Sequence, residues 1–109
     1  MEWRISAAGS DGFATISMRG DCDLYAAPAF AADVIARIRA GSKRIRLDFS
    51  AVAYLDSSGV GAVIRILQAA KAAQAEIRVR GLSGSPRKVM IMSNVISLLK
   101  EDPAEGRPR

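Results

Sequence analysis

The most constraining feature of the sequence is a short polar turn that joins two apolar segments of different periodicity. In residues 44–49 apolar side chains alternate with charged ones, which is the pattern of a strand with one buried face. From Val60 to Leu67 apolar residues recur at helical spacing. The turn itself, residues 54–61, contains an acidic residue, two serines and two glycines. Such residues cap helices and permit close backbone approach, so we predict a strand-to-helix turn with its serines at the helix start.

The other elements follow from the same kinds of pattern. The predicted strands are 3–8, 13–19, 43–49, 76–80 and a short edge strand at 95–99, and the predicted helices are 28–40, 57–74 and 85–94. The first two strands are joined by a short Gly-rich loop and therefore predict a hairpin. We expect an α/β fold, with a mixed sheet of four to five strands. Because the strands alternate and are not apolar throughout, the helices should pack mainly on one face.

The length of 109 residues fits one domain, which we expect to span residues 1–99. The last stretch, 100–109, contains two prolines and a glycine and lacks apolar periodicity, so we expect it to be disordered. The sequence has no apolar run of about 18 residues that would span a membrane. Its first residues do not resemble a signal peptide. We therefore expect a cytoplasmic protein without membrane contact.

The absence of histidine excludes several classes of enzyme. Serine hydrolase triads, histidine-ligated zinc and histidine phosphorelay all require that residue. A single cysteine, Cys22, excludes an internal disulfide and a cysteine-based metal cluster. The sequence also lacks the Gly-Lys-Ser/Thr phosphate loop and the Gly-x-Ser-x-Gly elbow. We expect no enzymatic activity, no metal site and no cofactor.

The formal net charge of +5 leaves two interpretations open. Strand alternation places Arg44, Arg46, Arg78 and Arg80 opposite the apolar residues of their strands. A solvated sheet face is the simpler interpretation, and a surface for nucleic acid, lipid headgroups or an acidic partner is the alternative. Few aromatic residues lie between these bases, so we do not expect direct binding of nucleic acid.

Two parts of the chain form specific motifs. One is Leu-Asp-Phe-Ser at 47–50 followed by Leu-Asp-Ser-Ser-Gly-Val-Gly at 55–61, and the other is Gly-Asp-Cys-Asp-Leu at 20–24. Both resemble the STAS family, and more narrowly the bacterial anti-sigma factor antagonists, whose Gly-Glu-Leu-Asp loop is similar to the second motif. The resemblance covers roughly residues 3–99. It implies that the protein is the substrate of a kinase and not itself an enzyme. The kinase would phosphorylate the serine that directly precedes the glycine. That serine is Ser58 here, with Ser57 as the second choice.

The resemblance also implies the partners. A serine kinase of the histidine-kinase-like ATPase type, which is itself the anti-sigma factor, would bind the unphosphorylated chain and release it after phosphorylation. ATP and magnesium would belong to that kinase, and a separate phosphatase would reset the switch. Asp23 and Asp56 would be the acidic neighbours of Ser58. In the family a last helix follows the edge strand, and the departure from this pattern at 100–109 leaves room for a homodimer.

Helical spacing predicts which residues near Ser58 face a partner. If Val60, Val63, Ile64 and Leu67 point inward, then an apolar stripe of small residues and one isoleucine points outward; this stripe contains Ala62, Ile66, Ala69 and Ala73. We therefore predict a partner surface made by Asp23, Asp56, Ser57, Gly59, Gly61, Ala62 and Ile66. The alternative is a helix that is alanine-rich for its helix propensity alone.

The start of the helix predicts how phosphorylation would act. Unpaired backbone N–H groups and the positive end of the helix dipole would favour a phosphate on Ser58, whereas Asp56 would repel it. Two other functions use the same residues. One is an anion or nucleotide-binding STAS module that uses the helix start and the basic strand face. The other is a structural STAS subunit of a larger signalling or transport assembly.

Overall fold

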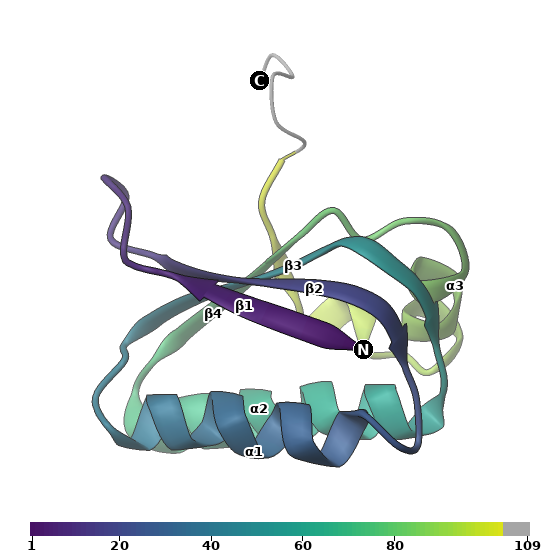
Figure 1. Cartoon of the computed structure of the whole chain (residues 1–109), viewed down its shortest axis with the longest axis horizontal. Helices are drawn as coiled ribbons and strands as arrows, with labels where there is room; N and C mark the ends of the chain where they lie inside the picture. The colour runs from purple at the N-terminus through teal and green to yellow at the C-terminus, as the bar shows by residue number, and fades with distance from the viewer. Residues whose placement is uncertain (104–109) are drawn as a thin grey trace.

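The computed structural model describes residues 1–103 of the chain and contains one five-stranded sheet (Figure 1). The strands are β1 (Glu2–Ser6), β2 (Ala14–Cys22), β3 (Arg44–Leu55), β4 (Glu76–Arg80) and β5 (Lys100–Glu101). The helices are α1 (Ala27–Arg39), α2 (Ser57–Ala73) and α3 (Gly84–Met92), and a 3₁₀ turn, Ile96–Leu98, precedes β5. The predicted α/β class and mixed sheet are confirmed.

The strands lie in the sheet in the order in which they occur in the chain. β1 and β2 form the predicted antiparallel hairpin, with Glu2 opposite Arg19 and Ser6 opposite Thr15. The other neighbouring pairs, β2–β3, β3–β4 and β4–β5, are parallel. Parallel neighbours need long crossovers, and α1, α2 and α3 supply them.

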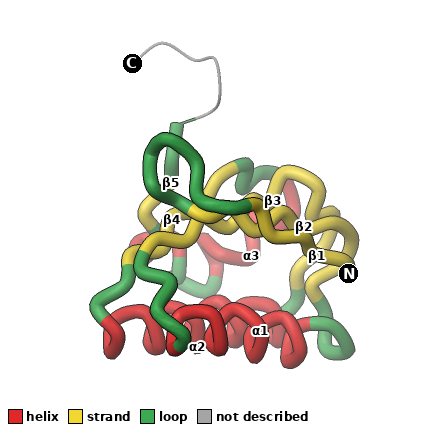
Figure 2. Tube along the Cα trace, turned by 60° about the vertical axis from the view of Figure 1, so that its left-hand side comes forward, coloured by secondary structure: helices red, strands yellow, loops and turns green. Residues whose placement is uncertain are grey.

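α1 and α2 lie side by side under one face of the sheet, as Figures 1 and 2 both show. The core between these layers contains the largest fully buried side chains, which include Phe30 from α1, Phe49 from β3 and Ile66 from α2. On β1, the Trp3 ring packs edge-on against Phe30 with centroids 5.4 Å apart. The Trp3 Nε1–H also donates a hydrogen bond of 2.7 Å to Asp33 on α1. The edge strand is therefore fixed to the helix layer by both apolar and polar contacts.

β3 is longer than the predicted strand 43–49, because its pairing with β2 continues to Leu55. The register between the two strands shifts between Ser17 and Arg19 and again between Gly20 and Asp21, and each shift places one extra residue in β3. Val52 and Leu55 keep one side of the extended strand buried. The segment from Ser50 to Tyr54 is therefore strand, and it carries the turn to the very end of the sheet.

The last strand differs from the prediction in position. Residues 95–99 contain the 3₁₀ turn and are not strand. The parallel pairing with β4 begins at residue 100, with Arg78 opposite Lys100 and Val79 opposite Glu101. Asp102 N–H then donates to the carbonyl oxygen of Val79 at 2.8 Å. Residues 100–102, which we expected to be disordered, therefore complete the sheet. The remainder of that expected tail, 104–109, lies outside the described residues.

The loop between β1 and β2 covers part of the other face of the sheet. Its last residue, Phe13, is buried, and three guanidinium groups lie 4.8–5.3 Å from the centre of its ring. These groups belong to Arg44, Arg46 and Arg78. Arg46 is only 8% exposed, and its side chain pairs with Asp11 at 2.6 Å and with Asp102 at 2.5 Å. The predicted solvated face is thus partly closed by a network of charges.

Candidate functional site

Asp56 is the residue that builds the strand-to-helix turn. Its backbone is extended, with φ −106° and ψ −171°, and its carboxylate caps α2. One oxygen, Oδ1, accepts hydrogen bonds from the backbone N–H of Ser58 at 2.8 Å and of Gly59 at 3.1 Å. An acidic N-cap satisfies two of the unpaired donors at a helix start and complements the positive end of its dipole. The capping residue is therefore the aspartate, and both serines lie within the first helical turn.

The second oxygen of Asp56 reaches across to the loop between β2 and α1. It accepts a hydrogen bond of 3.2 Å from the backbone N–H of Leu24. In return, the Asp56 N–H donates to the carbonyl oxygen of Cys22 at 3.3 Å. A single carboxylate therefore connects the helix that carries the serines to a loop about thirty residues earlier in the chain.

Asp23 lies in the same loop but has a different structural role. Its Oδ1 accepts hydrogen bonds from the N–H groups of Tyr25 and Ala26, both at 3.0 Å. Its carbonyl oxygen accepts from Ala27 N–H at 2.8 Å. These bonds form the turn that leads into α1. Asp23 and Asp56 both act on the neighbouring Cys22, whose pKa is raised to about 11, mainly by burial of the thiol and further by these two carboxylates.

Gly59 allows α2 to start this close to the sheet. A Cβ atom placed on it would lie 2.6 Å from the carbonyl oxygen of Cys22 and 2.8 Å from the side chain of Leu55. Contacts this short are not tolerated without movement of the backbone. Gly61 is different, because a Cβ atom there would meet nothing within 4 Å. Close approach within the fold therefore explains Gly59 but not Gly61.

The two serines differ in exposure. Ser57 is exposed and Ser58 is partly buried. Among the hydrogen bonds of residues 1–103, none involves the hydroxyl oxygen of either serine. Their hydroxyl groups are therefore not committed to holding the turn.

The occupied helix start corrects one sequence-based expectation. We expected unpaired N–H groups that would receive a phosphate, but Asp56 already accepts hydrogen bonds from the N–H groups of Ser58 and Gly59. The Val60 N–H donates to the carbonyl oxygen of Asp56 at 3.0 Å. A phosphate on Ser58 would therefore meet a carboxylate that holds the nearest donors.

The predicted outward stripe on α2 is wrong for Ala62 and Ile66, whereas Ala69 and Ala73 are partly exposed. Ala62 and Ile66 are each 0% exposed, so neither can contact a partner in this fold. The helix packs against α1 as well as against the sheet, and these two interfaces together bury a wide arc of its surface. Ile64 and Leu67, which we expected to point inward, are instead partly exposed. Of the predicted partner residues, Asp23, Asp56, Ser57 and Gly61 remain at least partly accessible.

Three large side chains near the turn were missed by sequence reasoning. Leu24 is 61% exposed, Tyr25 is 88% exposed and Tyr54 is 47% exposed. Leu24 and Tyr25 lie in the loop that Asp56 holds, and Tyr54 lies two residues before Asp56 in the chain. For Leu24 and Tyr25 the signal in the sequence was two large apolar side chains between a predicted strand and a predicted helix, outside the periodicity of either.

The basic strand face is largely neutralised by carboxylates. Arg80 pairs with Asp48 at 2.9 Å and Arg78 with Glu76 at 2.9 Å, in addition to the pairs made by Arg46. Burial opposes ionisation of Asp48, but hydrogen bonds from Ser50 and Arg80 outweigh it and lower its pKa. A site for an external anion would have to break these pairs.

Within residues 1–103 no group of three or more His, Cys, Asp or Glu side chains is placed to hold a metal ion. In the same part of the chain, no helix combines the length and the apolar character that crossing a membrane requires.

Solved structures with the same fold include several anti-sigma factor antagonists. One from Mycobacterium paratuberculosis is 18% identical, with a TM-score of 0.80 over 95% of this chain and 86% of that one. The Bacillus cell fate determinant SpoIIAA in its phosphorylated form is 22% identical, with a TM-score of 0.72 over 95% and 94%. A sulfate transporter family protein from Wolinella succinogenes is 14% identical, with a TM-score of 0.69 over 86% and 81%. At these identities the likeness concerns the fold.

Family membership comes from the sequence match. Residues 5–100 match the family model described as MlaB, STAS domain. This range includes both stretches that carry the resemblance, at 20–24 and 47–61, and almost all of the described structure. The chain therefore belongs to the STAS domain family.

Proposed function

We propose that this protein is an anti-sigma factor antagonist that works by partner switching, with Ser58 as its phosphorylation site. The observation that carries the proposal is the position of the Ser58 hydroxyl. It has no hydrogen-bond partner among the described residues, and it belongs to a residue whose N–H is held by Asp56. A kinase can therefore modify it without breaking a side-chain hydrogen bond of the fold. The SpoIIAA structure described as the phosphorylated form has the same fold, and this likeness supports the proposal that this chain is phosphorylated.

The proposed switch acts through Asp56. A phosphate on Ser58 adds about −1.5 to −2 charges at neutral pH. The Asp56 carboxylate holds the N–H of Ser58 itself, so the two negative groups compete for the same donors and repel each other. The same carboxylate also holds Leu24. Phosphorylation would therefore weaken the connection between the α2 start and the loop, as well as placing a dianion on the surface.

The partner surface that we propose differs from the stripe predicted from the sequence. It consists of Ser57, Ser58 and Gly61 on α2, with the exposed side chains of Leu24, Tyr25 and Tyr54 beside the turn. Aromatic residues at the centre of an interface often contribute much of its binding energy. Gly61 would allow close approach of the partner to the α2 backbone, since the fold itself does not require a glycine there.

The proposed partner is a serine kinase of the histidine-kinase-like ATPase type that also restrains a sigma factor. The unphosphorylated chain binds this kinase and frees the regulator, and phosphorylation dissociates the complex. A phosphatase reverses the modification. ATP and magnesium are cofactors of the kinase, and the chain acts in the cytoplasm as a regulator of transcription and not as an enzyme.

The first experiment combines the protein with ATP, magnesium and the candidate kinase encoded nearest to it, followed by mass spectrometry. Phosphate is expected on Ser58, and Ser58→Ala should accept none while still binding the kinase. Ser57→Ala is the matched control and should be phosphorylated like wild type. Phosphate on Ser57 would move the site by one residue, whereas no phosphate with an active kinase contradicts the proposal.

The second experiment measures the affinity for the kinase. Ser58→Asp should weaken binding by at least about tenfold, which corresponds to about 1.4 kcal/mol. Tyr25→Ala should weaken binding by a similar amount, because it removes an aromatic ring from the proposed interface. The side chain is largely exposed, so its removal should not disturb the core. Leu98→Ala, which removes an exposed leucine beside the far half of α2, is the control and should bind like wild type. Equal binding by all variants argues against this surface.

A second candidate is a structural STAS subunit of a signalling or transport assembly, alone or as a homodimer. The likeness to a sulfate transporter family protein favours it. Such a subunit would form a stable complex whatever the state of Ser58, and the kinase experiment separates the two functions. The nucleotide-binding alternative is disfavoured by the arginine pairs with Asp48, Glu76 and Asp102. Calorimetry with nucleotides and phosphate tests it directly.

A further inference from the structure

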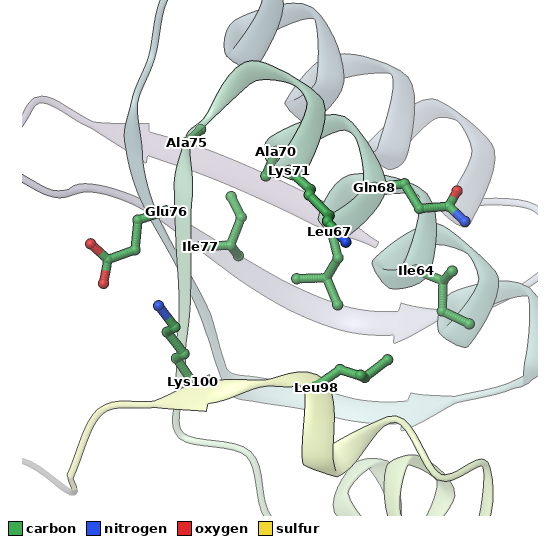
Figure 3. A pocket seen from close by; sticks show the side chains of 10 residues that line it. All are labelled: Ile64, Leu67, Gln68, Ala70, Lys71, Ala75, Glu76, Ile77, Leu98 and Lys100. Atoms are coloured by element: carbon green, nitrogen blue, oxygen red, sulfur yellow. The ribbon is translucent and has the colours of Figure 1, made fainter.

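An apolar groove of about 520 Å³ lies between the second half of α2 and the β4–β5 edge of the sheet (Figure 3). Ile64 and Leu67 line it from α2, and Ile77 lines it from β4. On the opposite side Leu98 points into it from the 3₁₀ turn before β5, and it is 62% exposed. The groove thus has apolar side chains on both walls and remains open to solvent.

The groove follows from the proportions of the two layers. Neighbouring strands lie about 4.8 Å apart, whereas packed helices lie about 8–10 Å apart, so two helices cover roughly four strands. α1 and α2 form the helix layer, and the fifth strand extends the sheet beyond α2 (Figures 1 and 2). The space beside α2 is therefore suited to a third helix. Within residues 1–103 no such helix fills it.

The rim of the groove is positively charged. Lys71 on α2 and Lys100 on β5 stand on its two sides, and neither makes an ion pair with another described residue. The one carboxylate at the rim, Glu76, is 2.9 Å from the guanidinium of Arg78. Lys100 also lies near enough to help lower the Glu76 pKa, after the larger effect of Arg78. With two lysines and one carboxylate among its lining residues, the groove has a net positive rim, and Lys71 stands on the side away from Glu76.

Charge and side-chain size argue against two occupants. Residues 104–109, Ala-Glu-Gly-Arg-Pro-Arg, have no large apolar side chain to fill the groove. A second copy of the chain would bring a net charge of +5. Its exposed apolar residues on α3, Ile91 and Met92, come with Lys88 on the same short helix, and Arg87 there is paired with Glu101. This surface therefore offers no free carboxylate to the lysines of the rim.

We propose that the groove binds an acidic amphipathic helix of a partner protein. The apolar stripe of such a helix would contact Leu67 and Leu98, and carboxylates on its flanks would pair with Lys71 and Lys100. The site is separate from the Ser58 switch, because thirteen residues of helix, or about 20 Å, lie between Ser58 and Lys71. Both surfaces can be occupied at once.

The probe for this proposal is a synthetic helical peptide of about 18 residues, with leucines at i, i+3, i+4 and i+7 spacing and glutamates on both flanks. NMR of the full chain should show shift changes at Ile64, Leu67, Ile77 and Leu98. Lys71→Glu should weaken binding at least about tenfold and should strengthen binding of a peptide with lysines in place of the glutamates. Arg39→Glu reverses a base in the last turn of α1 and is the matched control, with little expected effect.

Two further controls make the outcome specific. A peptide of the same composition with scrambled leucines should bind at least about tenfold more weakly, and Ser58→Asp should leave binding of the acidic peptide unchanged. If the acidic peptide shifts no groove residue, or if Lys71→Glu and Arg39→Glu have equal effects, the proposal is wrong. It is also wrong if the groove residues shift with protein concentration alone and Leu98→Glu abolishes that shift, because a second copy would then be the occupant.

Discussion

At the scale of single residues, the candidate site depends on the difference between two glycines in the first turns of α2. Gly59 faces the Cys22 carbonyl oxygen, where an added Cβ atom would lie at 2.6 Å. The side of the helix at Gly61 is open. Both glycines reduce the helix propensity of the segment, since each costs roughly 1 kcal/mol relative to alanine. Only Gly59 is required by the packing of the turn.

Alanine at the two positions should therefore have opposite effects on stability. Gly59→Ala should lower the free energy of unfolding by about 1–3 kcal/mol, because the methyl group forces α2 away from β2. Gly61→Ala should raise it by about 0.5–1 kcal/mol, because alanine favours the helix. Urea unfolding followed by circular dichroism measures both. A stable Gly59→Ala protein would contradict the close contact between the turn and Cys22.

Sequence reasoning recognised that glycines in this turn permit close approach, but not which glycine needs it. The distinction depends on the carbonyl oxygen of Cys22, which comes from a strand more than thirty residues earlier. Likewise, the pattern placed a cap at the helix start without identifying Asp56 as the acceptor for Leu24. Local residue types indicate a turn, whereas contacts between distant segments decide the role of each residue in it.

At the scale of elements, α2 shows why helical spacing gave the wrong outer face. Ile66 and Ala62 are fully buried, and Ile64 and Leu67 are partly exposed along the groove. A helix beside a second helix is covered from two directions, so its buried arc is wider than one stripe and is shifted toward its neighbour. The existence and length of α2 could be predicted from the sequence, but its rotation depended on the position of α1.

The connection that Asp56 makes between α2 and the preceding loop gives a prediction at this scale. Asp56→Ala removes an N-cap and should lower the free energy of unfolding by about 1–2 kcal/mol. It should also increase hydrogen exchange at the amides of Leu24 and Ser58, because both N–H groups lose their acceptor. Asp56→Asn retains a side-chain oxygen that can cap the helix and should lose only a few tenths of a kcal/mol. Unchanged exchange at Leu24 would mean that the loop is held by other contacts.

At the scale of the whole molecule, charges close one face of the sheet. Arg46 connects Asp11 in the first loop with Asp102 after the last strand. Backbone and side-chain hydrogen bonds from Phe13 and Arg46 lower the pKa of Asp11. A hydrogen bond from Arg78 lowers the pKa of Glu76. Together with Asp48, these carboxylates are easier to ionise in the folded chain than in the unfolded one.

The sign of the resulting pH dependence follows from these lowered pKa values. As the pH falls, the unfolded chain binds protons at these carboxylates before the folded chain does, so stability decreases. The free energy of unfolding should be nearly constant above about pH 5 and should fall below about pH 4. Asp48→Asn should lower it by about 1 kcal/mol at pH 7 and flatten the acid slope, because Arg80 loses its partner. Urea unfolding between pH 7 and pH 3 measures both, and a slope of equal size in wild type and variant would contradict this role for Asp48.

The sequence allowed prediction of the mixed sheet and the helix layer, because periodicity reports which faces are buried. It did not allow prediction of the position of β5, since Lys100 and Glu101 have no apolar pattern. Their place is set by pairing with β4 and by two ion pairs, Arg87 with Glu101 and Arg46 with Asp102. The pairing of the basic face could not be predicted either, because the carboxylates that compensate its arginines come from distant parts of the sequence.

The Arg46–Asp102 pair has a consequence for the order of folding during synthesis. Arg46 is nearly buried in the middle of the sheet, but one of its two acidic partners, Asp102, is translated 56 residues later. A nascent chain can form the hairpin, α1 and β3 while that guanidinium still lacks Asp102. Completion of the domain must therefore wait until residue 102 has been synthesised, and a product that ends before it would retain a poorly compensated buried cation.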